Sequence, residues 1–154
     1  MEKFLENLGK AQEGINRVEH LIYVVFPLLK DKKILLRSLT EMKIAMAICV
    51  NLLLQYDYLY KKIKLYKDPQ ENFRTFREKS APRYGINNQE IDAVTKLFCL
   101  IEKHKQGSFE FLKDEKIIIL SESLRQETIT LEKIKELLGL SKEILKKTKK
   151  AFLR

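Results

Sequence analysis

Two long stretches of the chain carry apolar residues at spacings that alternate between four and three. In the first stretch, from Phe4 to Leu29, positions 4, 8, 11, 15, 18, 22, 25 and 29 are all apolar. In the second, from Leu35 to Ile63, positions 35, 39, 42, 46, 49, 53, 56, 60 and 63 are all apolar. This is the spacing of a heptad seam, the stripe along which two helices pack. The pattern predicts two long helices, the second running from about 33 to 66.

The segment between these two stretches is short and polar. Pro27 disfavours helical backbone at the residue before it, so the first helix is expected to end or kink near 25–27. The stretch KDKK at 30–33 then forms the turn. Because long helices joined by a short connection lie antiparallel, residues 1–66 are predicted to form a helical hairpin. Within 44–54 apolar residues extend beyond the seam, so this part must be covered by further helices or by a second subunit.

The remaining residues predict a more varied second half. A basic connector at 67–87 holds prolines and a glycine, and 88–154 follows as a helix, a β-hairpin and a C-terminal helix. Asn87 and Glu90 are spaced as in a capping box, which marks a helix start. Alternating aromatic and β-branched residues near 109–120 indicate a short β-hairpin, which must lie on the helices because an isolated hairpin is marginally stable.

These elements together predict a mainly α fold. We expect a single helical domain over 1–154, a bundle of about four helices built on the long N-terminal hairpin, with one short β-hairpin. The last helix is expected to begin after Thr128 or Thr130. The chain has only 5 glycines and 3 prolines, which excludes a β-sandwich with many turns.

Composition adds a positive charge to this picture. Lys and Arg number 30 against 21 Asp and Glu, a formal net charge of +9. Such a balance bears on partners and solubility rather than on the fold, and it favours a polyanionic partner. The N-terminus MEKFLENLGK has no apolar signal core, and the apolar run at 44–54 is too short to span a bilayer. We therefore expect a cytoplasmic protein with no membrane partner.

The residues that usually carry catalysis form no recognisable set. Cys49 and Cys99 each lie in an apolar helical run and are interpreted as free buried thiols. His20 and His104 are far from them in sequence, so no zinc site is expected. Glycine loops that cradle phosphate and spaced nucleophile–base sets are not found in the sequence. The sequence thus favours a non-enzymatic protein with no cofactor and no metal.

The stretch 61–83 concentrates the basic charge and sets it among aromatic residues. Lysines and arginines next to aromatic rings are typical of surfaces that neutralise a single-stranded backbone and stack its bases. In the alternative interpretation the aromatic residues face the core and the stretch only connects helices. The residues predicted to contact RNA or another polyanion are Lys61, Lys62, Lys64, Lys67, Phe73, Arg74, Phe76, Arg77, Lys79, Arg83 and Tyr84, with Lys146, Lys147, Lys149 and Lys150 near the C-terminus.

Two other functions are compatible with the pattern. Residues 130–152 resemble a DNA-binding helix-turn-helix if Gly139 is the turn glycine, although one continuous helix through Gly139 also fits the apolar spacing. The second long helix, with tyrosines near its end, is suited to a helical interaction with a partner protein or with a second copy in a homodimer.

Overall fold

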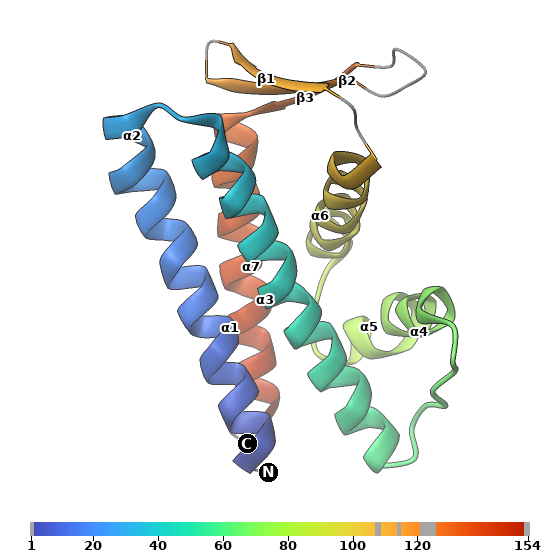
Figure 1. The fold of residues 1–154 in the computed structure, drawn as a ribbon. Helices are drawn as coiled ribbons and strands as arrows, with labels where there is room; N and C mark the ends of the chain where they lie inside the picture. The colour runs from blue at the N-terminus through green and yellow to red at the C-terminus, as the bar shows by residue number, and fades with distance from the viewer. Residues whose placement is uncertain (1, 107–108, 114, 121–125, 153–154) are drawn as a thin grey trace.

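The structure is a bundle of helices with a small antiparallel sheet across one end (Figure 1). It is a computed structural model that describes residues 2–106, 109–113, 115–120 and 126–152. The long helices are α1 (Glu2–His20), α3 (Lys32–Leu59), α6 (Asn88–Gln106) and α7 (Leu131–Phe152). The predicted fold class, a mainly α bundle with a short β-hairpin, is confirmed.

Helix α3 lies at the centre of this bundle. Its seam residues Met46, Cys49 and Leu53 are completely buried, because α1, α6 and α7 of the same chain pack around it. Ile44 keeps half of its surface exposed, so the helices of one chain do not cover 44–54 on every side. By length and composition alone, α3 could cross a membrane. However, 56% of its most apolar 18-residue segment is buried inside the protein, as in the core helix of a bundle.

The first helix continues past the point where it was expected to end. A π-helical turn, Leu21–Val25, follows α1, and the short helix α2 (Phe26–Leu29) follows the turn. A proline ring clashes with the carbonyl four residues before it, and the wider π turn removes that clash. The Phe26 N–H instead donates to the carbonyl of Leu21. The π turn holds one residue more than an α-helical turn. The apolar seam therefore continues at Phe26, which is completely buried, and not at position 25.

Helix α3 ends well before the predicted position 66. Lys61 adopts the left-handed conformation with φ 59°, and its N–H donates to the Tyr58 carbonyl over 3.0 Å. The Lys62 N–H donates to the Asp57 carbonyl over 2.9 Å. Together these bonds form a Schellman motif, which closes a helix. The apolar seam misled the prediction because Ile63 is buried although it lies in the loop.

The predicted connector is itself largely helical. It consists of α4 (Pro69–Thr75), a second π-helical turn (Phe76–Ser80) and α5 (Ala81–Arg83). As at the first π turn, a proline follows closely, here Pro82, and the Ala81 N–H donates to the carbonyl of Phe76. The connector therefore packs against α3 as an ordered element.

The capping box that was predicted at the start of α6 is present. The Asn87 side chain accepts from the Glu90 N–H over 2.8 Å, and the Glu90 carboxylate accepts from the Asn87 N–H over 2.9 Å. The carboxylate of Glu90 is buried and also pairs with Lys147 of α7 over 2.6 Å. These contacts fix the start of α6 against α7.

The sheet contains one strand more than the sequence predicted. Strands β1 (Phe109–Lys113) and β2 (Lys116–Leu120) form the expected hairpin, and β3 (Gln126–Thr130) pairs with β2. Ile117 and Ile129 are buried, so the sheet lies on the bundle as required for its stability. Lys30, in the turn before α3, pairs with Glu115 over 2.7 Å and lowers the pKa of that carboxyl.

Helix α7 runs without interruption through Gly139, so the helix-turn-helix interpretation of 130–152 is wrong. A glycine inside a helix costs only about 1 kcal/mol, which the apolar face of α7 offsets. At its far end the ring of Phe152 stacks on Phe4 of α1, with 5.4 Å between the ring centroids. The outer ends of α1 and α7 therefore lie together (Figure 1).

Candidate polyanion-binding surface

The predicted basic stretch divides into residues that hold the fold and residues that face solvent. Phe76 is completely buried, and Phe73 packs on the rings of Phe76 and Phe98 at 5.9 and 5.3 Å. The prediction that Phe76 stacks on a base is wrong, because its ring has no exposed face. Phe73 is half-buried and packs against the same hydrophobic cluster.

Arg83 and Tyr84 bind a carboxylate inside the protein. Asp57, in the last turn of α3, is completely buried and accepts hydrogen bonds from Ser80, over 2.7 Å, and from the Tyr84 hydroxyl. The Arg83 guanidinium lies 2.7 Å from the same carboxylate. A buried charge needs such partners, since it has lost its hydration. Burial and the hydrogen bond to Asp57 raise the pKa of the Tyr84 hydroxyl. These contacts attach α5 to α3.

The other two arginines of the stretch are at the surface. Arg74 pairs with Glu78 over 3.1 Å, and this hydrogen bond raises the pKa of Arg74. The Arg77 guanidinium lies over the ring of Phe73, 5.4 Å from its centroid. Both side chains are exposed, and exposed contacts of this kind contribute little to stability. Both guanidinium groups therefore remain accessible to a ligand.

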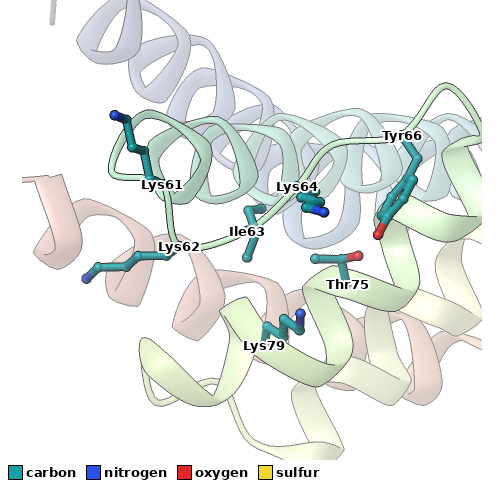
Figure 2. Close-up of a pocket in the computed structure, with 7 residues that line it drawn as sticks. All are labelled: Lys61, Lys62, Ile63, Lys64, Tyr66, Thr75 and Lys79. Atoms are coloured by element: carbon teal, nitrogen blue, oxygen red, sulfur yellow. The ribbon is translucent and has the colours of Figure 1, made fainter.

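Four of the predicted lysines line one surface hollow of about 370 Å³ (Figure 2). We call it the lysine hollow, and it is lined by Lys61, Lys62, Ile63, Lys64, Tyr66, Thr75 and Lys79. Among the described residues none of the lining side chains is acidic, and none of these four lysines has an ion pair within 4.0 Å. The side chains of Lys64, Tyr66, Thr75 and Lys79 gather around the same space, whereas Lys61 and Lys62 extend away from it (Figure 2).

The backbone around the lysine hollow is fixed on both sides. The Asn72 side chain of α4 donates to the Tyr66 carbonyl over 2.8 Å and accepts from the Tyr66 N–H over 2.7 Å. Ile63 is buried beneath the loop, and Lys79 precedes Ser80, which is bound to Asp57. The backbone positions from which these lysines extend are therefore fixed relative to one another.

The remaining predicted lysines lie elsewhere. Lys67 is exposed but is not among the residues that line the lysine hollow. Lys147 forms an ion pair with the buried Glu90, and Lys149 donates a hydrogen bond to Gln12 of α1. Lys146 and Lys150 line a separate groove of about 670 Å³ between α1 and α7. The structure thus does not bring the C-terminal lysines to the lysine hollow.

Three lining residues were not predicted for this role: the buried Ile63, and Tyr66 and Thr75. Tyr66 is one of the tyrosines near the end of the predicted second helix, which were expected to suit a dimer interface because a tyrosine buries much area at low entropic cost. The signal that could have found it is its place in the sequence KIKLYK, where Tyr66 lies between Lys64 and Lys67. Nothing in the sequence indicated Thr75, because its approach to the loop depends on how α4 folds back.

The cysteines differ in environment. Cys49 is buried as predicted, and burial raises the pKa of its thiol to about 12. Cys99 is exposed, so the prediction of a buried thiol is wrong there: it lies on α6 between the buried Leu97 and Leu100, on the face turned from the core. His20 is exposed at the end of α1, and the side chain of His104 lies outside the described residues.

Within the part of the chain that the structure describes, no group of three His, Cys, Asp or Glu side chains could hold a metal ion. No protein-family model matches the chain, and neither the curated proteins nor the solved structures compared with it gave a match.

Proposed function

We propose that this protein binds a polyanion, RNA in preference to DNA, through the lysine hollow. The observation that carries the proposal is that Lys61, Lys62, Lys64 and Lys79 all border one hollow whose described lining holds no acidic side chain, with Lys64 and Lys79 turned toward its space. Neighbouring cations without a counter-charge are suited to a ligand that brings negative charge of its own. A flexible single strand can place one phosphate in so small a hollow.

The charge of the site sets the expected dependence on salt. If Lys64 and Lys79 share the phosphate in the hollow and Lys61 and Lys62 each meet a neighbouring phosphate, three phosphates are neutralised. The slope of log affinity against log salt is then about −2, since each phosphate contributes roughly −0.7. Arg74 and Arg77 lie outside the hollow on α4 and the π turn after it, and each further phosphate contact makes the slope steeper.

The test is fluorescence anisotropy with a labelled random single-stranded RNA across a salt series. A variant with Lys61, Lys62, Lys64 and Lys79 changed to Gln is expected to lose about tenfold in affinity or more, and most of the salt slope. The matched control removes the same charge elsewhere, at the exposed Lys3, Lys33, Lys96 and Lys116, which were not predicted to contact the ligand.

The control variant is expected to lose much less affinity than the lysine-hollow variant. Absence of binding at low salt, or equal losses in the two variants, would contradict the proposal. Arg83 is left unchanged in both, because its removal would disturb Asp57 and confuse binding with folding.

A helical interaction module is the second candidate, and a different surface favours it. At the junction of α1 and α2, Leu28 and Leu29 are 79% and 67% exposed, and Tyr23 and Val24 beside them are about half exposed. Exposed apolar groups that cluster in this way are typical of protein interfaces. The predicted surface, α3 itself, exposes Tyr58 and Leu59 at its end.

A further inference from the structure

Tyr66 stands apart from the other residues of the lysine hollow because it is aromatic. Its side chain is 51% exposed, and its hydroxyl has no hydrogen-bond partner among the described residues. The two bonds to Asn72 hold its backbone in place. In Figure 2 its ring stands at the edge of the hollow beside Thr75, with Lys64 and Lys79 around the same space.

The hydroxyl and the ring of Tyr66 suit two parts of one ligand. The hydroxyl, with the ammonium groups of Lys64 and Lys79, offers hydrogen bonds to a phosphate. The Thr75 hydroxyl donates to the Glu71 carbonyl over 3.0 Å, so it presents its oxygen rather than its hydrogen to the hollow. The exposed surface of the tyrosine ring is apolar and aromatic, and a nucleic-acid base stacks well on such a surface.

We infer that the lysine hollow holds one phosphate of a single-stranded nucleic acid while a neighbouring base stacks on Tyr66. The inference rests on the proposed function and adds the kind of polyanion. In a duplex the bases are stacked on one another and are not free to meet a side chain. A polyphosphate offers the charge without a base. Of these three ligands, the single strand alone uses both the cations and the ring.

The experiment separates the ring from the hydroxyl. Tyr66→Ala and Tyr66→Phe are compared with the unchanged protein for binding to a labelled single-stranded RNA and to inorganic polyphosphate. Tyr66→Ala is expected to weaken RNA binding about fivefold or more beyond any loss for polyphosphate, because stacking is lost. Tyr66→Phe keeps the ring and loses only the hydroxyl. It is therefore expected to weaken the binding of RNA and of polyphosphate by the same small factor.

Folding and the two proposals are distinguished by the same measurements. Thermal unfolding of each variant shows that it is folded, since Tyr66 is exposed and its removal leaves no cavity. If Tyr66→Ala weakens RNA and polyphosphate equally, or duplex RNA binds as tightly as the single strand, this inference is overturned while the lysine hollow stands as a polyanion site.

Two outcomes remain. If the unchanged protein binds neither RNA nor polyphosphate at low salt, the proposed function falls, and this inference falls with it. If it binds phosphatidylserine vesicles through Tyr66 and ignores RNA, the ligand is a lipid surface, and the inference is overturned in favour of that class.

Discussion

Asp57 shows how one side chain decides the arrangement of a whole segment. It lies on α3 with its carboxylate removed from water, and its three partners all come from residues 80–84. From the sequence, Arg83 and Tyr84 could equally have belonged to a binding surface. Their role could not be predicted because it depends on a residue more than twenty positions away.

Removing this carboxylate should destabilise the fold. Asp57→Ala leaves Arg83, Ser80 and Tyr84 without their acceptor, and we expect the free energy of unfolding to fall by about 3 kcal/mol. Chemical denaturation measures this. Asp92→Ala serves as the control, because Asp92 is exposed on α6 and its loss should change stability by less than about 0.5 kcal/mol. Equal effects of the two substitutions would mean that the Asp57 cluster does not hold the fold.

The two thiols should differ in reactivity. With an aromatic disulfide reagent at pH 8, Cys99 is expected to react at once and Cys49 only after unfolding, because burial raises the pKa of Cys49 to about 12. The folded state holds that proton more tightly than the unfolded state does, so this contribution to stability is present below pH 9 and is lost as the pH rises toward 12. Rapid reaction of both thiols in the native protein would be inconsistent with the packing around α3.

At the scale of elements, apolar spacing predicted helices well and their ends poorly. The seams of α1 and α3 and the strands near 109–120 follow from the sequence. The end of α3 does not, because Ile63 continues the seam from within a loop and the Schellman bonds are made by the backbone. Strand β3 was missed although Thr128, Ile129 and Thr130 are all β-branched, a composition typical of strands.

Two glycines should respond to alanine with opposite signs. A Cβ added at Gly139 meets nothing within 4 Å in the middle of α7, so Gly139→Ala is expected to stabilise the protein by about 0.5–1 kcal/mol. Gly85 has φ +73°, a conformation that other residues adopt at a cost, so Gly85→Ala should destabilise it by about 1 kcal/mol. Both are measured by denaturation. Loss of stability in Gly139→Ala would contradict the open space around Gly139 on α7.

At the scale of the molecule, the candidate site could be predicted only in part. The basic stretch was visible in the sequence, but its three predicted aromatic residues, Phe73, Phe76 and Tyr84, pack in or against the core. Two of its arginines pair with carboxylates of the chain itself, Arg74 with Glu78 and Arg83 with Asp57. The lysine hollow arises because residues 61–66 and 75–79 meet after α4 folds back. That meeting depends on tertiary contacts, the two bonds of Asn72 among them, which no local pattern encodes.

The mass in solution tests the second candidate function at this scale. If the exposed apolar patch at α2 pairs with another copy, light scattering should give twice 18.2 kDa at micromolar concentration, and a variant with Leu28 and Leu29 changed to Glu should be monomeric. A clean monomer of the unchanged chain would leave this patch without a self-association role.

The contact between Phe4 and Phe152 has a consequence for protein engineering. Since the outer ends of α1 and α7 meet, a short linker could join them and new ends could be opened in a surface loop (Figure 1). Domains whose ends lie close together tolerate circular permutation. They can also be inserted into a loop of a host protein without disturbing the fold of the host. The bundle is thus suited to insertion into a well-characterised host protein, where its surface loops could be studied.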